Sequence, residues 1–381
     1  MSRRLSFYIH IPYCIKRCGY CDFNTYTPRE LQGPDISTVS KNYIDAAICE
    51  IEQAAMRFGG AEVPTVFFGG GTPSLLPASE LSRVLDAIRK HFNLSAEAEI
   101  TIEANPDSVT SEFLQKMRQS GATRISIGMQ SAVPHVLAAL DRTHSPENIE
   151  RAVTAVRGAG FEHCSVDLIY GVPSESMKDW QHSVNTALGL DIDHLSAYAL
   201  IVEAGTRLSQ RIKAGELAMP PEDETAEKYL YLDQACERAG MYWYELSNWS
   251  KPGSECRHNI AYWNGSMWWG IGPGAHSFID GKRWWNVKHP MTYQELLSRN
   301  DSPIQDSESL SEENQRTEFL MLTIRMREGI GLNLLDEYQR LKASDFERTG
   351  HIDSEHWRAG KLVLTQTGRL IADRIVREMM V

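Results

Sequence analysis

The sequence predicts an α/β fold followed by a smaller α+β region, and two observations support this prediction. Short β-rich runs alternate with helical patterns through the first half of the chain, and the alternation stops near residue 205. Such alternation is typical of parallel strands joined by right-handed crossovers. Six units are too few for a closed eightfold barrel, so the pattern fits a partial (β/α)6 barrel or a doubly wound sheet. In both folds, functional side chains lie on loops that follow the strands.

The elements of the first half follow from two periodicities. The predicted strands are runs rich in β-branched and aromatic residues, and they cover residues 6–11, 65–68, 99–103, 123–128, 165–169 and 194–199. The predicted helices carry apolar residues at helical spacing, and they cover residues 39–58, 80–92, 111–119, 146–157 and 176–188. Gly121 and Gly160 follow two of these helices, where glycine permits the left-handed turn that ends a helix.

The second half has a different character. One more helix is predicted over residues 222–238, and seven of the nine tryptophans then fall within residues 243–285. The Asp280-Gly281 pair predicts a hairpin over residues 278–284. A helical pattern returns after Ser311, and the chain ends with a short strand at 361–365 and a helix at 367–380. We therefore expect a barrel over residues 1–210 and a second region over 211–381, with an aromatic-rich segment at 242–285 and a winged-helix-like end at 311–381. Residues 31–40 and 300–313 are expected to be the loosest.

Composition excludes several classes of protein. The 381 residues are 42% hydrophobic and 23% charged, which is typical of a globular protein. The formal net charge of −11 argues against binding to nucleic acid or anionic membranes. No apolar run approaches the roughly 18 residues of a membrane span, and the N-terminus lacks the features of a secretory signal. Seven cysteines, three of them crowded together, predict a reducing compartment, which we take to be the cytoplasm.

Cys14, Cys18 and Cys21 follow the first predicted strand directly. Their spacing lets one loop wrap three thiolates around a metal centre, with the neighbouring Lys16 and Arg17 expected to lower the thiol pKa values. Three cysteines can hold three irons of a 4Fe-4S cluster and leave the fourth open. A zinc site, a redox-active thiol site and chance clustering remain alternatives. The fourth zinc ligand would then come from a set of more distant residues, namely His10, Cys49, Cys164, Cys236 and Cys256.

Polar or glycine-rich sequences also end the later strands. Three glycines at 69–71 precede Thr72 after the second strand and permit a close approach of the backbone to a ligand. Glu103 ends the third strand, Gln130 follows the fourth, and Asp167 lies within the fifth, where a carboxylate needs a partner. Each residue alone has an ordinary structural explanation, but their common position near the cysteine loop predicts a binding site.

The cysteine motif, with Tyr20 before its third cysteine, resembles that of the radical S-adenosylmethionine (SAM) superfamily. This resemblance implies a partial (β/α)6 barrel and a 4Fe-4S cluster held by Cys14, Cys18 and Cys21. It also implies that SAM binds the open iron, and that an electron from the cluster cleaves it to release a 5′-deoxyadenosyl radical.

Three longer motifs narrow the resemblance. Residues 8–14, 69–73 and 167–173 are similar to the branch that holds the oxygen-independent coproporphyrinogen III oxidases and the HemW heme chaperones. The resemblance covers nearly the whole chain. It implies that Tyr8, Gly70 and Glu103 contact the cluster-bound SAM. The positions that contact a second SAM in the oxidase correspond here to Tyr20, Gly71, Thr72, Gln130, Arg142 and Asp167.

Two departures separate this chain from the oxidases. Phe23 stands where the oxidases carry a further cysteine, and the first strand begins near residue 5 without their N-terminal extension. Residues 258–263 are similar to the HNxxYW motif of the heme chaperones, which implies that His258, Asn259, Tyr262 and Trp263 bind heme. A neutral imidazole suits heme iron, and the aromatic rings suit the faces of a macrocycle. Cys256 and His276 are weaker candidates. We expect residues 242–285 to form a surface separate from the barrel mouth.

The resemblance implies a cytoplasmic heme chaperone that carries a 4Fe-4S cluster and SAM, binds heme, and delivers it to heme-requiring proteins. The alternatives are a coproporphyrinogen III oxidase, whose activity is not expected here, and a radical SAM enzyme acting on another substrate. The expected partners are heme and heme-accepting proteins, without nucleic acid or an integral membrane segment, and a homodimer stays open.

Overall fold

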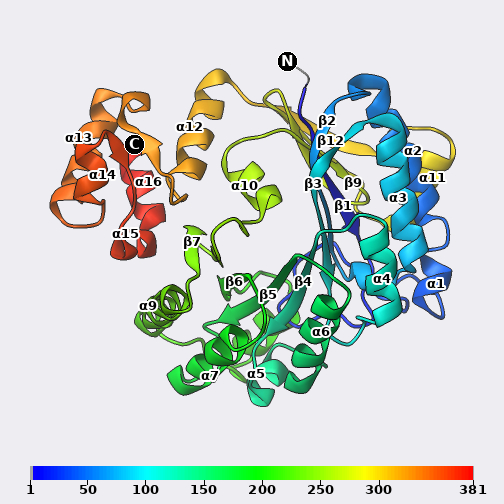
Figure 1. The fold of residues 1–381 in the computed structure, drawn as a ribbon, viewed down its shortest axis with the longest axis horizontal. Helices are drawn as coiled ribbons and strands as arrows, with labels where there is room; N and C mark the ends of the chain where they lie inside the picture. Colours follow the sequence, from blue (N-terminus) through cyan, green and yellow to red (C-terminus); the bar gives the residue numbers. More distant parts are fainter. Residues whose placement is uncertain (1–2, 381) are drawn as a thin grey trace.

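The computed structural model describes residues 3–380, and within them twelve strands form one curved, mixed sheet (Figure 1). Its order is β12-β11-β10-β9-β1-β2-β3-β4-β5-β6-β8-β7. The strands β1 to β6 are Ser6–Ile11, Glu62–Gly70, Asn93–Ala104, Arg124–Gln130, His163–Tyr170 and His194–Ala199. All five neighbouring pairs among these six strands are parallel. The predicted partial (β/α)6 barrel is therefore confirmed.

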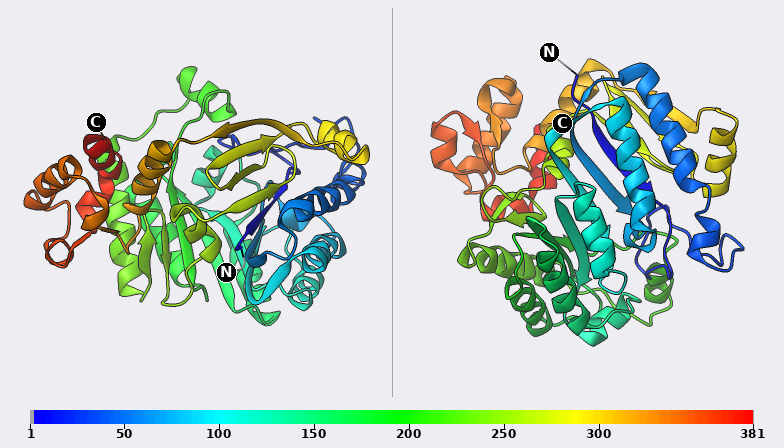
Figure 2. Two further views of the ribbon diagram at one scale, coloured as in Figure 1. Left: turned by 90° about the horizontal axis from the view of Figure 1, so that it is seen from above. Right: turned by 45° about the vertical axis from the view of Figure 1, so that its right-hand side comes forward.

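The crossover helices lie on the outer, convex face of the sheet (Figures 1 and 2). They are α2 (Tyr43–Phe58), α3 (Ala78–His91), α4 (Ser111–Gln119), α6 (Pro146–Gly158) and α7 (Met177–Leu188), and each overlaps a predicted helix. Gly121 and Gly160 have φ values of 93° and 81° just after α4 and α6, as predicted for helix ends. Short helices α1 (Ile36–Val39), α5 (Pro134–Ala139) and α8 (Arg207–Lys213) occupy loops, so residues 31–40 are less irregular than expected.

The tryptophan-rich region extends both edges of this sheet. After α9 (Glu222–Arg238), β7 (Tyr242–Glu245) and β8 (Asn248–Ser250) join the β6 edge. After α10 (Arg257–Trp263), β9 (Trp268–Ile271) pairs in parallel with β1. The predicted hairpin is confirmed as β10 (His276–Ile279) and β11 (Lys282–Asn286). β12 (Ile304–Ser309) pairs with β11 after α11 (Pro290–Ser298), so the expectation of a loose segment at 300–313 was wrong.

The two main hydrophobic clusters do not divide the chain at residue 210. The domain boundary at that residue stays a prediction. The large core contains buried side chains from Leu5 to Leu297 and therefore joins the barrel to the tryptophan-rich region. A second cluster spans Leu320 to Met379 in the smaller C-terminal region. That region consists of α12 (Glu312–Thr323), β13 (Ile330–Gly331), α13 (Glu337–Arg348), α14 (Ser354–Arg358), β14 (Lys361–Leu362), α15 (Gln366–Leu370) and α16 (Ala372–Met380).

The helices within residues 3–380 include none with both the length and the hydrophobicity of a membrane span.

Candidate functional site

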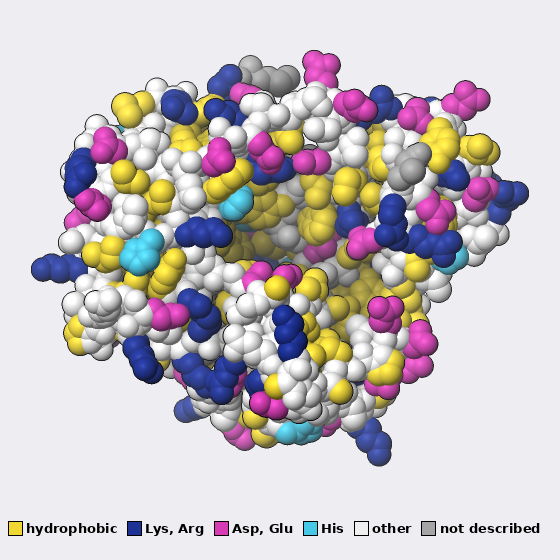
Figure 3. Space-filling model, turned by 180° about the vertical axis from the view of Figure 1, so that it is seen from behind, with side chains coloured by type: hydrophobic (Ala, Val, Ile, Leu, Met, Phe, Trp, Pro, Cys, Tyr) yellow, Lys and Arg dark blue, Asp and Glu magenta, His cyan; other side chains and the backbone are white. Residues whose placement is uncertain are grey.

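A cavity of about 710 Å³ occupies the concave side of the sheet. From behind, the molecule is hollowed near its middle, with hydrophobic side chains in the hollow and charged side chains around it (Figure 3). The cavity wall includes the cysteine loop, the ends of the parallel strands, and part of α10. Its volume lies within the range of about 300–1,000 Å³ that is usual for ligand pockets.

The parallel strands line this cavity with every second residue, because successive side chains point to opposite faces of a sheet. Apolar residues such as Ile102, Ile127 and Leu168 are buried in the hydrophobic core. The alternate positions line the cavity and are mostly polar, and they are Thr101, Glu103, Arg124, Ser126, Ser165, Asp167, His194 and Ser196. The strand register aligns Glu103 with Ser126, and Asp167 with Ser196. The sheet therefore presents an ordered polar surface to the cavity.

Cys14, Cys18 and Cys21 all line the mouth of the cavity, on the loop between β1 and α1. Burial raises the pKa of the Cys14 thiol to about 11, and a hydrogen bond with Thr72 counteracts this rise. A guanidinium nitrogen of Arg142 lies 3.5 Å from the Cys18 sulfur.

The expected influence of Lys16 and Arg17 on the thiols was wrong. Arg17 pairs with Glu30, and Lys16 lies 4.0 Å from Asp141. The cation beside the cysteine loop is instead Arg142, which comes from far along the chain because β4 ends next to this loop.

The donor set fits an iron–sulfur cluster better than a single ion. Within the described residues, no three histidine, cysteine, aspartate or glutamate side chains converge closely enough to hold one metal ion. A cubane cluster requires no such convergence, since each thiolate binds a different iron. His10 does not face the cysteines, because its ring nitrogens contact the Tyr8 hydroxyl at 3.1 Å and the Asn24 carbonyl at 2.9 Å. The zinc alternative with His10 therefore lacks its fourth ligand.

Glu103 lies beside the glycine turn at the end of β2. The backbone N–H of Gly70 donates to the Glu103 carboxylate at 3.1 Å. Gly70 has a φ of 107°, and a Cβ at this position would lie 2.5 Å from the ring of His10, so a larger residue cannot be accommodated. Burial raises the pKa of Glu103 to about 8, and the negative charge of Asp167 contributes to this rise. A positively charged ligand group would relieve both effects.

The remaining residues predicted to contact SAM also line the cavity. They are Tyr8, Tyr20, Gly71, Thr72, Gln130, Arg142 and Asp167. Burial raises the pKa of Asp167 to about 6, although hydrogen bonds from Ser196 and Ser126 oppose the rise. Gln130 adopts a φ of 62° where β4 ends. Phe23, which marks the departure from the oxidases, is 64% exposed at the cavity wall.

His258 begins the first turn of α10 and is only 2% exposed. Its Nδ1 lies 2.7 Å from the Thr65 hydroxyl, and its Nε2 lies 3.1 Å from the Tyr262 hydroxyl. The ring stacks on Phe67 with centroids 5.1 Å apart. Burial lowers the pKa of His258 to about 4, which keeps the imidazole neutral and able to bind a metal.

The expectation that residues 242–285 form a separate surface was wrong. His258, Asn259 and Tyr262 line the same cavity as the cysteines. The physical reason is the pairing of β8 with β6 and of β9 with β1, which forces the connecting helix α10 across the concave side of the sheet (Figure 1). Trp263 and His276 are not part of the cavity wall, and His276 is exposed on β10.

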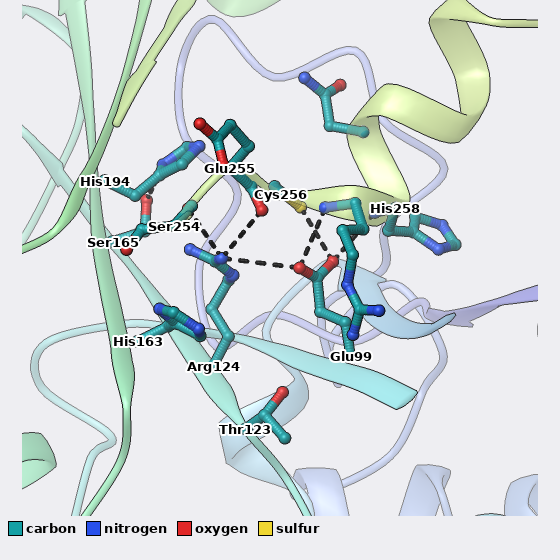
Figure 4. A network of polar contacts seen from close by, with 12 residues as sticks. Glu99, Thr123, Arg124, His163, Ser165, His194, Ser254, Glu255, Cys256 and His258 are labelled. Atoms are coloured by element: carbon teal, nitrogen blue, oxygen red, sulfur yellow. Dashed lines mark hydrogen bonds and ion pairs between the residues drawn. The ribbon is translucent and has the colours of Figure 1, made fainter. Parts of the chain in front are cut away.

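Asn259 holds α10 in place. Its side-chain amide donates to the Tyr244 hydroxyl at 3.3 Å and to the Glu245 carboxylate at 3.2 Å, both on β7. Glu99 performs the same task from β3, because it accepts the backbone N–H groups of Arg257 and His258 (Figure 4).

Sequence reasoning missed Glu99 and Arg124, which lie next to each other beside the start of α10. Glu99 is 3% exposed and Arg124 is 1% exposed. The signal that could have identified Arg124 is the alternation of its strand, in which polar residues at every second position mark the cavity face. Glu99 carries the same signal, because Glu99, Thr101 and Glu103 alternate with apolar residues along β3, but its partners more than 150 positions away could not be predicted.

The sequence and the fold are similar to those of known proteins. Residues 8–187 match the family model of the radical SAM superfamily. The chain is 47% identical over 375 residues to the heme chaperone HemW of Mycobacterium tuberculosis, covering 98% of this chain and 94% of that protein. It is 35% identical to the heme chaperone HemW of Bacillus subtilis, covering 85% and 84% of the two chains.

Among solved structures, the fold is similar to that of the coproporphyrinogen III oxidase HemN of Escherichia coli. The TM-score is 0.84 at 22% sequence identity, and the match covers 99% of this chain and 90% of the oxidase. At this identity the likeness establishes the fold alone.

Proposed function

The chain belongs to the HemW heme chaperone family of the radical SAM superfamily, and from this premise we propose that it binds heme and delivers it to heme-requiring proteins. The observation that supports this proposal best is the shared cavity. Its wall carries both the three cysteines and the motif residues His258, Asn259 and Tyr262. A chain with cysteines but no imidazole in this cavity would suggest radical chemistry on another substrate.

The radical SAM family implies a 4Fe-4S cluster and SAM, and the residues present fit both. We assign the cluster to Cys14, Cys18 and Cys21, and we assign the amino group of SAM to the region of Glu103 and the Gly70 turn. When bound, the cluster supplies an electron that can reduce the sulfonium of SAM. Tyr8 completes this part of the wall, and its hydroxyl is held by His10.

For heme, we assign the axial ligand to His258. The Thr65 hydroxyl holds Nδ1 and so fixes the ring orientation, while the hydrogen-bond partner of Nε2 within the described residues is the hydroxyl of Tyr262. Rotation of Tyr262 would free Nε2 for iron. Asn259 acts by positioning α10, since its amide is directed at Tyr244 and Glu245. Trp263 is the last residue of α10 and is not among the residues that line the cavity, and its role in heme binding stays a prediction.

We also propose that delivery takes place in the cytoplasm and that the recipients are heme-requiring proteins of that compartment. The thiols of the cysteine loop must be reduced to bind iron, which favours a reducing compartment.

The first prediction tests the proposal directly. His258→Ala should lose most of its heme affinity and its heme Soret band, because the substitution removes the proposed axial ligand. The iron–sulfur absorbance should persist, since the cysteines belong to a different loop. His276→Ala is the matched control, because this histidine is exposed and outside the cavity, and it should bind heme like the wild type.

Transfer of heme to a heme-free acceptor is measured beside decarboxylation of coproporphyrinogen III, using reconstituted wild-type protein. Transfer without decarboxylation supports a chaperone. A wild-type protein that takes up no heme but decarboxylates the porphyrinogen would contradict the proposal and support the oxidase alternative.

A further inference from the structure

Arg124 is a buried cation whose role neither the cluster, SAM nor the imidazole ligand accounts for. It lies on β4, lines the cavity, and is 1% exposed. One guanidinium nitrogen donates to the backbone carbonyls of Ser254 at 2.9 Å and Glu255 at 3.3 Å (Figure 4). The other two guanidinium nitrogens have no hydrogen-bond partner within residues 3–380.

The nearest carboxylate does not neutralise this cation fully. Glu99 lies 3.5 Å from Arg124, a longer distance than that of a good ion pair. The same carboxylate already accepts the backbone N–H groups of Arg257 and His258 and the thiol of Cys256. Arg369, another buried arginine, instead has two nitrogens paired with Asp233 at 2.8 and 2.6 Å. Arg124 thus retains capacity to donate to a further acceptor.

A second unpartnered donor stands beside it. Thr101 on β3 is aligned with Arg124 in the strand register and also lines the cavity. Its hydroxyl is fully buried and has no partner in the part of the chain that the structure describes. Buried polar groups are rarely left unpaired, because each one costs free energy on desolvation. A guanidinium and a hydroxyl on neighbouring strands match the two oxygens of a carboxylate.

The position of this pair indicates which carboxylate it would accept. Glu99 contacts Arg124 and also accepts the backbone N–H of His258, so the guanidinium lies close to the start of α10, the helix that carries His258 (Figure 4). Heme carries two propionate groups. Because Glu103 and Asp167 also line the cavity, an anionic macrocycle needs a cation there to offset their repulsion. Arg142 already contacts Cys18 and the Gly128 carbonyl.

We propose that Arg124 and Thr101 form a carboxylate-binding site that holds a propionate of the heme bound at His258. This inference rests on the proposed heme-binding function and names the group that recognises the cargo. The site would orient the macrocycle inside the cavity and discriminate against porphyrins that lack free carboxylates.

The test compares heme with heme dimethyl ester, whose propionates carry no charge, on the folded full-length protein. Wild type should bind heme at least about tenfold more tightly than the diester, because a charge-assisted hydrogen bond is lost. Arg124→Met should weaken heme binding by about ten- to a hundredfold and leave the diester affinity within about twofold. Arg157→Met is the control, since this arginine lies outside the cavity, and it should retain the wild-type preference.

Thr101→Val provides a second variant if Arg124→Met does not fold, and it should reduce the preference for heme over the diester severalfold. An equal loss of affinity for both ligands in Arg124→Met would overturn the inference by giving Arg124 a purely structural role. Wild type that binds both ligands equally would also overturn it, while the heme-binding function stands. Wild type that binds neither ligand would contradict the proposed function itself, and the carboxylate site with it.

Discussion

Glu103 and Asp167 are partly exposed carboxyl groups that line the cavity, and the negative charge of Asp167 acts on Glu103. Burial raises both pKa values, to about 8 for Glu103 and about 6 for Asp167. The unliganded protein therefore holds these side chains in an environment that disfavours their charged form. A ligand with a positive amino group would reverse this preference, so the same residues that destabilise the empty cavity favour such a ligand.

The second prediction uses this pKa shift. The folded-state pKa of Glu103 lies above its ordinary value of 4.5, so its favourable contribution is fully present below about pH 4.5 and is lost as the pH rises towards 8. Glu103→Gln should therefore raise the free energy of unfolding of the unliganded protein by about 2–4 kcal/mol at pH 8. At pH 5 the difference should be within about 1 kcal/mol.

Urea denaturation at the two pH values measures this difference. Glu112→Gln, at an exposed position on α4, is the control and should change neither value by more than about 0.5 kcal/mol. A variant that is equally stabilised at both pH values would show that the carboxyl charge is not the cause.

The sequence identified those site residues whose position follows from a local pattern. The cysteine loop, the Gly70 turn and Glu103 follow strands whose ends could be predicted, and the structure brings them together. Arg124 could have been found from the alternation along β4. Its partners, the carbonyls of Ser254 and Glu255, are 130 and 131 residues away, so no local pattern announces them.

At the scale of elements, Glu50 joins the extension of the sheet to the barrel. It lies on α2 and is 1% exposed. Its carboxylate accepts the backbone N–H of Gly272 at 2.9 Å, the Asn286 amide at 2.7 Å, and the Tyr293 hydroxyl at 2.5 Å. These three donors belong to the segment from β9 to α11, so one side chain ties that segment to the barrel.

The third prediction removes this tie. Glu50→Ala should leave three buried donors unpaired and lower the free energy of unfolding by about 3–5 kcal/mol. Hydrogen exchange should quicken most in β9 and β11, next to the lost acceptor. The control is Glu52→Ala on the exposed face of α2, which should cost no more than about 0.5 kcal/mol. Unchanged exchange in β9 and β11 would indicate that apolar packing alone holds the extension.

The elements themselves were predictable where they are local. Helices α4 and α9 match their predicted ranges, and the Asp280-Gly281 turn correctly indicated the β10–β11 hairpin. The pairing of β9 with β1 was not predictable, because it joins Ser6 to Trp268 across most of the chain. The wrong expectation of a separate aromatic surface follows from this pairing and from that of β8 with β6, which together place α10 over the concave side of the sheet.

At the scale of the whole molecule, the curvature of the sheet brings together two sites that are distant in sequence. Tyr8 and His258 both contact Phe67, with ring centroids 6.2 and 5.1 Å apart from it. Phe67 also lines the cavity between them. A ligand beside Tyr8 and a ligand beside His258 would therefore share one cavity and one wall residue, Phe67. Two separate surfaces would let SAM and heme bind independently. In one shared cavity, we expect each ligand to change the affinity for the other.

The fourth prediction follows from this shared cavity. Saturating SAM should weaken heme binding to the cluster-loaded wild type by at least about fivefold, since the two ligands compete for space and contacts. Coupling between binding sites is reciprocal, so heme should weaken SAM binding by the same factor. Soret titration and calorimetry measure the two directions independently, and unequal factors would reveal a fault in either measurement. Phe67→Ala should reduce the coupling, because it removes the ring that both Tyr8 and His258 contact and widens the cavity there. Heme affinity that does not change with SAM would place the heme outside the cavity, despite the position of His258 within it.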